Sequence, residues 1–257
     1  MSQNKIKLKT GEDIAKLRIG GSRLGKIIKA LSVEVKDGTS TGHIDNLFYN
    51  MVTSAGDIPV LLGYKPYGAD YPYPASICIS INEEIVHGIP NDKTIIKNGD
   101  LVKLDACLSH MGMIVDHAIT VPCGKITKEE KDLLEITKKA RAAGIKAAIV
   151  GNYISDISKA IEKEVGNKYG IVKILSGHGV GYAVHEEPYV PNYYDGIRGV
   201  KLQAGLVLAI EPMLNMGSDD AELCADGYTF VTADGKKSAH FEHTILITEK
   251  GPEILTI

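Results

Sequence analysis

The chain has 257 residues, of which 44% are hydrophobic and 24% are charged, so it can bury a large core as one domain or as two fused halves. Its formal net charge of -3 argues against general nucleic-acid binding, which a basic excess would signal. No run approaches the roughly 18 apolar residues of a membrane span, and the polar segment 1–13 lacks the apolar core of a signal peptide.

The four cysteines are widely spaced and include no C-x-x-C pair. This pattern is typical of reduced, buried thiols rather than of disulfides or a structural zinc site. We therefore expect a soluble, cytoplasmic protein.

The first half of the chain predicts two helices followed by strands. Residues 11–31 carry apolar side chains near helical spacing, and a second helix is predicted to begin near Thr41. Residues 56–74 are rich in Gly, Pro and Tyr, which predicts a loop. A strand is expected at 77–81, and the runs 101–108 and 113–121 predict an antiparallel hairpin.

The second half predicts the same order of elements. Thr127 and Glu130 form a capping box that predicts the start of a helix, and a shorter helix is expected after Gly151. The glycine-rich segment 176–181 is read as a turn that leads to a loop at 187–194. Strands are then expected within 206–214, 228–234, 241–248 and 253–257.

The two halves also match in spacing. In each half a glycine lies six residues before an isoleucine of the second helix, and another lies six residues before an acid in a strand. The matched pairs are Gly38 and Ile44 with Gly151 and Ile157, and Gly99 and Asp105 with Gly205 and Glu211. We predict one α+β domain over 1–257, built from duplicated α/β halves at about 11–124 and 125–257, with helices covering one face of a curved antiparallel sheet and a site between the halves.

Four acids lie inside strand-like apolar runs, where a buried strand should have none: Asp105, Asp116, Glu211 and Glu242. Burying one unpaired carboxylate costs several kcal/mol, and we expect no Lys or Arg to alternate with these acids at matching positions. A cluster of divalent metal ions would supply the missing positive charge. The acids therefore predict a metal centre with hydrolytic chemistry.

The predicted hairpin places two of these acids most directly. Ser109 and Gly112 occupy the first and fourth positions of a type I turn signature. If that turn is symmetric, Asp105 lies directly opposite Asp116 with both side chains on one face. Two carboxylates that close repel each other unless cations lie between them.

Histidines complete the predicted site. His178 lies in a glycine-rich segment that has neither the Walker nor the Rossmann spacing, and it is the fifth candidate ligand. Four carboxylates and one imidazole balance two divalent cations and suit Mn, Fe or Co at least as well as Zn. His87 and His185 are interpreted as neutral donors or acid/base groups beside the metals. A structural or solvent-facing role is expected for His43, His110, His117, His240 and His243.

Several motifs together resemble the type I methionine aminopeptidases of the pita-bread fold. In chain order they are HGIPND, the Asp105/Asp116 pair, SGHGVG with VHEEPYVPNY, AIEPMLN and FEHTILIT. The resemblance as a whole runs from about Gly11 to the carboxyl end. The resemblance implies a pseudo-two-fold α+β fold and two divalent metal ions per chain (Co, Mn, Fe or Zn). It implies a hydrolase that removes the initiator methionine from nascent chains with a small second residue, by metal-activated hydroxide attack on the methionyl peptide bond. The implied partners are nascent amino termini, at the ribosome, and a monomer is expected.

The resemblance also implies roles for single residues. The metal ligands would be Asp105, Asp116, His178, Glu211 and Glu242. Asp116 and Glu242 would bridge the two ions, and Asp105 would hold one of them alone. His178 and Glu211 would complete the shell of the other ion.

Two histidines and one acid carry the implied catalytic roles. Glu211 would shuttle protons, and His185 would hydrogen-bond the methionyl carbonyl oxygen as negative charge develops on it. His87 would lie near the scissile amide and bind the substrate backbone.

The methionine pocket implied by the resemblance consists of Tyr64, Tyr73, Cys78, Val184 and Tyr228. Three positions depart from the family pattern: Val184 replaces the usual Phe, Tyr228 a common Trp, and His240 a usual Gln. The loop 65–72 is also longer than usual. These departures concern the shape of the pocket and the substrate range rather than the metal chemistry.

Two other functions remain open from the sequence. An X-Pro peptidase of the same fold usually carries an extra amino-terminal domain, for which the residues before His87 leave little room. A non-catalytic pita-bread protein that binds peptides would have lost metal ligands, and all five are present here.

Overall fold

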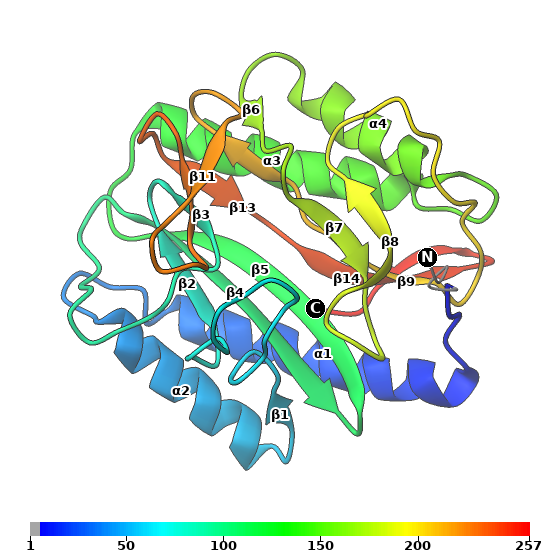
Figure 1. Cartoon of the computed structure of the whole chain (residues 1–257), viewed down its shortest axis with the longest axis horizontal. Coiled ribbons are helices and arrows are strands. Elements are labelled where there is room, and N and C mark those ends of the chain that lie inside the picture. Colours follow the sequence, from blue (N-terminus) through cyan, green and yellow to red (C-terminus); the bar gives the residue numbers. More distant parts are fainter. Residues whose placement is uncertain (1–5) are drawn as a thin grey trace.

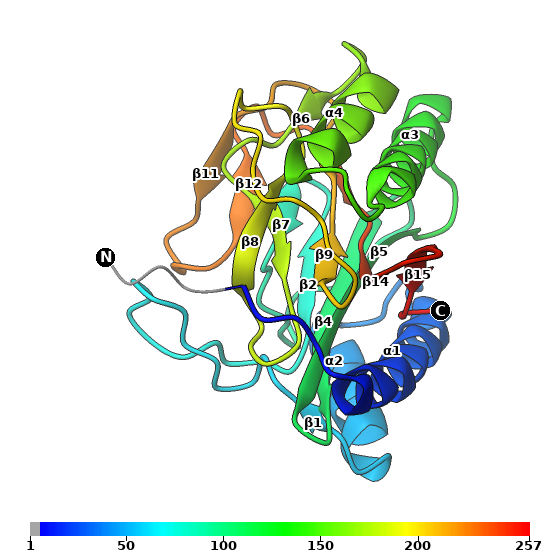
Figure 2. The same ribbon diagram turned by 90° about the vertical axis from the view of Figure 1, so that its right-hand side faces the viewer.

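The computed structural model describes residues 6–257, so residues 1–5 of the polar amino-terminal segment lie outside the described range. The helices are α1 (Gly11–Ser32), α2 (Thr41–Ser54), α3 (Lys128–Ala147) and α4 (Ile154–Val165). In Figure 1, α1 and α2 lie below the strands and α3 and α4 above them. Figure 2 shows the helices toward one side of the molecule and strands such as β7, β8 and β11 toward the other. The predicted α+β class is confirmed.

The strands pair in antiparallel fashion in four sheets within residues 6–257. One sheet contains β1 (Ile58–Pro59), β2 (Cys78–Ile81), β4 (Leu101–His110) and β5 (Met113–Pro122). Another contains β7 (Ser176–Gly179), β8 (Glu186–Pro191), β9 (Val207–Ile210), β14 (His243–Thr248) and β15 (Gly251–Ile254). The two smaller sheets contain β3 (Glu84–Val86), β11 (Ala221–Leu223) and β12 (Phe230–Thr232), and β6 (Gly170–Ile171), β10 (Met213–Asn215) and β13 (Ser238–His240).

The helix starts follow from local hydrogen bonding. Thr127 and Glu130 form the predicted capping box at α3, and Thr10 and Asp13 form a second one at α1. In each box the threonine oxygen accepts from the backbone N–H three residues on, and the acid accepts from the backbone N–H of the threonine. Such caps typically stabilise a helix by about 1 kcal/mol each.

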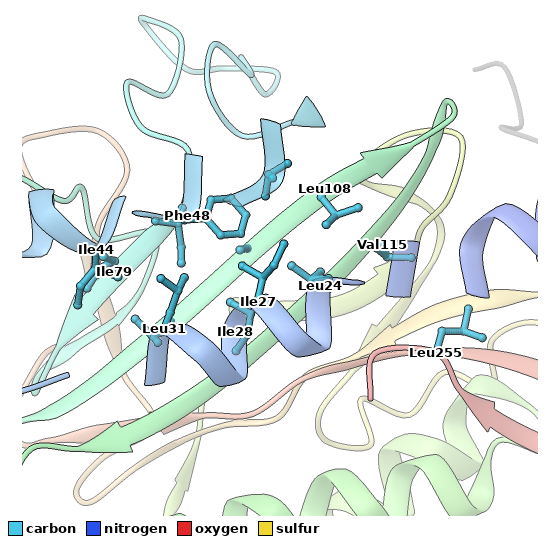
Figure 3. Packing of buried hydrophobic residues seen from close by; sticks show 14 of the residues in the cluster. Leu24, Ile27, Ile28, Leu31, Ile44, Phe48, Ile79, Leu108, Val115 and Leu255 are labelled. Carbon is cyan, nitrogen blue, oxygen red and sulfur yellow. The ribbon is translucent and has the colours of Figure 1, made fainter. Parts of the chain in front are cut away.

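The core of the first half fixes the hairpin of β4 and β5. Figure 3 shows Leu24, Ile28 and Leu31 of α1 lying along the hairpin, and they form one buried cluster with the hairpin residues Leu108 and Val115. Side chains alternate between the two faces of a strand, so the residues next to these core positions point to the opposite face. Each fully buried Leu or Ile contributes roughly 1.5–3 kcal/mol, and this packing therefore holds the opposite face, which carries Asp105 and Asp116, in place.

The register of this hairpin differs from the prediction. Asp116 lies opposite Cys107, and Asp105 lies opposite Ala118. The strands are joined by a two-residue turn in which Met111 (φ 50°) and Gly112 (φ 84°) both have positive φ, as in a type I′ turn. That turn matches the right-handed twist of paired strands better than the expected type I turn, which explains the shift. Asp105 and Asp116 therefore share one face as diagonal rather than direct neighbours.

The expectation that no Lys or Arg alternates with the acids was wrong. Lys103 lies two residues before Asp105 in β4 and is completely buried. Its Nζ donates to the carbonyl oxygens of Asn82 (2.7 Å) and Ser238 (3.4 Å) rather than to a carboxylate of the site. Burial lowers the pKa of Lys103 to about 7. Within residues 6–257, the carboxylates of the site thus have no Lys or Arg side chain as a direct partner.

Two segments of the second half were predicted wrongly as a turn and a loop. Residues of the glycine-rich segment form β7, and part of the proline-rich segment forms β8. A Cβ on Gly177 would lie 2.4 Å from the Ala209 oxygen, and one on Gly179 would lie 2.5 Å from the Glu187 oxygen. These glycines therefore allow close backbone approach inside a sheet. The prolines of β8 fit because β8 is an edge strand.

The structure gives matching hydrogen bonds to the two halves. Before α2, the Gly38 N–H donates to Ile96 O (2.9 Å), and before α4 the Gly151 N–H donates to Leu202 O (3.1 Å). The residues preceding the two helices also form isolated bridges, Ser40 with Ile95 and Tyr153 with Lys201. These matches agree with a duplicated unit. The division at about 11–124 and 125–257 within one domain stays a prediction.

Candidate functional site

All twelve residues that the sequence singled out line one cavity of about 320 Å³. They are Tyr64, Tyr73, Cys78, His87, Asp105, Asp116, His178, Val184, His185, Glu211, Tyr228 and Glu242. Residues of both predicted halves therefore contribute to one site.

Five candidate ligands come from five different segments of the chain. Asp105 lies on β4, Asp116 on β5 and His178 on β7, while Glu211 directly follows β9 and Glu242 lies between β13 and β14. One ligand atom each from Asp116, His178 and Glu242 lie within 4.8 Å of one another. His178 Nε2 is also 3.3 Å from Glu211 Oε1. A single metal centre can therefore draw on strands from both halves.

Hydrogen bonds hold the backbone of these ligands in place. Thr244 Oγ1 accepts from the Asp116 N–H (2.8 Å) and donates to Asp116 O (2.7 Å). His117 Nδ1 lies 2.6 Å from Glu242 O, and His178 Nδ1 lies 2.9 Å from Gly179 O. Donation from His178 Nδ1 to that carbonyl leaves its Nε2 lone pair directed at the acids, which is the tautomer a metal ligand needs.

Burial raises the pKa of the acids in this cluster. The pKa of Asp105 rises to about 8, that of Asp116 to about 7 and that of Glu211 to about 8. Burial raises the pKa of Glu242 as well, and the neighbouring acids raise it further. Burial instead lowers the pKa of His178 to about 3, so its imidazole is neutral. Cations placed among these groups would favour the ionised carboxylates.

The donor set fits a pair of divalent ions. Asp116 Oδ1 and Glu242 Oε1 are buried, and within residues 6–257 neither has a hydrogen-bond partner. A buried carboxylate oxygen without a partner is costly, and a metal ion satisfies it. Four carboxylates and one neutral imidazole form a hard, oxygen-rich set whose negative charge balances two divalent cations.

Metal removal is expected to lower the melting temperature by more at about pH 8 than at about pH 5.5. In the metal-free fold Asp105 and Glu211 keep protons up to about pH 8, whereas in the unfolded chain they lose them near pH 4. The stability that these groups contribute is therefore fully present below about pH 4 and is lost as the pH rises to about 8. Bound cations replace the protons and remove that loss.

Thermal unfolding with Mn²⁺ and with EDTA across this pH range measures the effect. In a domain of this size, each kcal/mol of stability shifts the melting temperature by roughly 2–4 °C. The difference in melting temperature between the Mn²⁺ and EDTA samples should therefore widen by several degrees as the pH rises. A difference between these two melting temperatures that stays constant with pH would contradict the raised pKa values of Asp105 and Glu211.

His87 and His185 both line the cavity that contains the acids. His87 directly follows β3, and burial lowers its pKa to about 4. The His185 ring lies 4.5 Å from that of His178, and the Tyr64 hydroxyl lies 3.0 Å from His185 Nδ1. Although His185 is exposed at the cavity mouth, loss of water on its inner side lowers its pKa. Both rings are therefore neutral near pH 7.

An apolar wall adjoins the acids. Tyr73, Cys78, Val184 and Tyr228 are buried in one cluster, against which the partly buried Tyr64 packs. The rings of Tyr73 and Tyr228 meet edge-on with centroids 5.1 Å apart. This wall suits a flexible apolar side chain next to a polar reaction centre.

The sequence interpretation missed two side chains at this site. Cys107 lines the cavity opposite Asp116, and its position two residues after Asp105 could have revealed it. His240 was expected to be structural or solvent-facing, yet its side chain is buried with Nε2 3.6 Å from Glu211 Oε2. Its spacing of two residues from Glu242 was the available signal.

None of the helices within residues 6–257 is long and apolar enough to cross a membrane.

Comparisons with known proteins agree with this geometry. Residues 15–249 match the model of metallopeptidase family M24. The methionine aminopeptidase of Aquifex aeolicus is 43% identical over 255 residues, which is 98% of each chain. The crystal structure of methionine aminopeptidase from Rickettsia prowazekii superposes with a TM-score of 0.93 at 35% identity, covering 98% of this chain and 100% of that one. Prolidase from Pyrococcus furiosus (TM-score 0.75, 22% identity, 97% of this chain and 65% of that chain) shares the fold alone.

Proposed function

This chain belongs to the methionine aminopeptidases of metallopeptidase family M24, and from that premise we propose how its own residues remove the initiator methionine from nascent proteins. One observation carries the proposal: five ligand-type side chains converge in a cavity that also has a buried, aromatic apolar wall. The first feature supports peptide-bond hydrolysis, and the second supports selection of the methionine side chain.

Two divalent ions would be held by Asp105, Asp116, His178, Glu211 and Glu242. When bound, such ions polarise a carbonyl group and lower the pKa of water, which supplies the nucleophile and the Lewis acid for hydrolysis. Asp116 and Glu242 are proposed as the bridging pair, because each has a buried oxygen without a partner in the described part of the chain. Glu211 is proposed to accept a proton from water and to return it to the departing amine.

The histidines are proposed to orient the substrate. If the Tyr64 hydroxyl donates to His185 Nδ1, the proton of the neutral ring is on Nε2. That N–H would donate to the methionyl carbonyl oxygen as negative charge develops on it. His87 is proposed to bind the scissile amide and the substrate backbone.

The cavity also supports selection at both ends of the cleaved bond. Tyr64, Tyr73, Cys78, Val184 and Tyr228 are proposed to contact the methionine side chain. The metal centre would also accept the free, neutral amino group of the substrate, which would restrict cleavage to the first residue. We propose that a small second residue is required, that the enzyme is a cytoplasmic monomer, and that it meets nascent chains at the ribosome.

Peptide cleavage tests the assignment. The protein, loaded with Mn²⁺ or Co²⁺, is expected to release methionine from Met-Ala-Ser and to leave an Ala-Pro dipeptide intact. Cleavage of the Ala-Pro dipeptide alone would favour an X-Pro peptidase and overturn the proposal. Failure to cleave either peptide, with metal bound, would favour a peptide-binding protein instead.

A further inference from the structure

We propose that His240 is a positioning residue of the metal centre, whose Nε2–H donates a hydrogen bond to Glu211 Oε2 and holds that carboxylate in its ligand orientation. The inference rests on the proposed function only in taking Glu211 as a metal ligand. It assigns a role to a side chain outside the cavity lining.

The first argument is that the His240 ring is buried without partners. His240 is 1% exposed, and among residues 6–257 neither Nδ1 nor Nε2 has a hydrogen-bond partner. A buried polar group left unpaired costs about 1–3 kcal/mol. By contrast, the neighbouring buried ring of His117 has Glu242 O as its partner. The unpaired ring of His240 therefore indicates a hydrogen-bond acceptor or donor close to the ring.

The second argument is the placement of the Glu211 carboxylate between two imidazoles. His178 Nε2 lies 3.3 Å from Oε1, and His240 Nε2 lies 3.6 Å from Oε2. The second distance is just outside hydrogen-bonding range, and a small rotation about the last side-chain torsion of Glu211, which has a broad energy minimum, would close it. Asn192 Nδ2 donates to Glu211 O (3.2 Å) and fixes the backbone about which the carboxylate turns.

The third argument is that the His240 backbone is clamped. Thr120 Oγ1 accepts from the His240 N–H (2.9 Å) and donates to His240 O (2.7 Å). His240 also lies opposite Met213 in the ladder of β13 and β10. A ring mounted on a backbone with two hydrogen bonds to one buried side chain has little freedom to move away from Glu211.

The position of the ring favours donation to Glu211 over direct metal binding. The three residues whose ligand atoms gather within 4.8 Å are Asp116, His178 and Glu242, not His240. His178 faces one oxygen of Glu211, and His240 faces the other. The two rings can therefore divide the tasks, with the lone pair of His178 directed to an ion and the N–H of His240 directed to the carboxylate. Removing a residue that hydrogen-bonds to a metal ligand typically weakens metal binding by roughly 10–100-fold.

Two substitutions separate these roles. His240→Leu removes the donor at similar bulk, while His240→Gln keeps an amide N–H that can reach the same oxygen. We expect His240→Leu to weaken Mn²⁺ binding by roughly 10–100-fold and His240→Gln to remain within about threefold of the parent. Calorimetric titration with Mn²⁺ gives affinity and stoichiometry, and melting temperatures in EDTA show whether each variant folds.

A matched control is His110→Leu, which removes a buried imidazole that contacts Asp57 and Arg23 away from the cavity. Unchanged Mn²⁺ affinity in a folded His240→Leu protein would overturn the proposal. So would equal losses in the Leu and Gln variants together with a changed visible absorption spectrum of bound Co²⁺, since that result means the imidazole is itself a ligand. Because these titrations contain no peptide, failure of the aminopeptidase assignment would leave their result intact.

Discussion

Replacing Asp116 with Asn is expected to abolish peptide hydrolysis and to lower the metal content of the purified protein. Asp116 supplies one of the three ligand atoms that lie within 4.8 Å of one another, and it has a buried Oδ1 without a partner in the described residues. The amide is neutral and cannot bridge two cations through two anionic oxygens, so three carboxylates would remain to balance two divalent ions. Elemental analysis by mass spectrometry, together with Met-Ala-Ser hydrolysis, measures both effects.

A suitable control for this variant is Asp57→Asn. Asp57 is also buried in the first half, but it pairs with Arg23 and His110 outside the cavity. That variant should keep its metal content even if its melting temperature falls. Unaltered metal stoichiometry in the Asp116→Asn protein would overturn the proposed bridging role of Asp116.

Replacing His185 with Ala is expected to lower turnover by roughly 10²–10³-fold while both metal ions stay bound. The ring lies at the mouth of the cavity, beside the His178 ring, and the Tyr64 hydroxyl contacts its Nδ1. The hydrogen bond from this ring to the carbonyl oxygen would strengthen only as negative charge develops in the transition state. Its loss should therefore reduce kcat more than it raises KM. Steady-state kinetics and metal analysis on the same sample make the measurement.

The exposed His43 on α2 offers a control, since His43→Ala removes an imidazole far from the reaction. Near-normal turnover in the His185→Ala protein would show that this ring takes no part in the mechanism. A loss of metal in parallel with activity would instead assign it a structural role at the centre.

The sequence predicted the parts of the fold that depend on local chemistry. The capping residues Thr127 and Glu130 correctly marked the start of α3 because the reciprocal bonds need only residues close in sequence. The apolar run around Asp105 correctly placed this acid in a strand. The motif resemblance gathered twelve residues that the structure brings to one cavity.

The predictions that were wrong concern the conformation of one turn and contacts between segments that are far apart in the sequence. The hairpin register depended on positive φ at Met111 and Gly112, which composition alone does not determine. The segment at Gly177 and Gly179 was taken for a turn because glycine usually indicates one, whereas here it permits close strand packing. The role of His240 was missed because its neighbour Glu211 follows a different strand, β9, and no local pattern joins the two.

The wide separation of the five ligand positions, from residue 105 to residue 242, has a consequence for biogenesis. The proposed centre draws on both predicted halves, so a chain still under synthesis lacks a complete ligand set until Glu242 has been made. Ions that join segments so far apart act as cross-links, which restrict the unfolded chain more strongly the longer the loop they close. We therefore expect cation binding at the complete set to follow the synthesis of Glu242 and to stabilise the packing of the segments that carry these five residues.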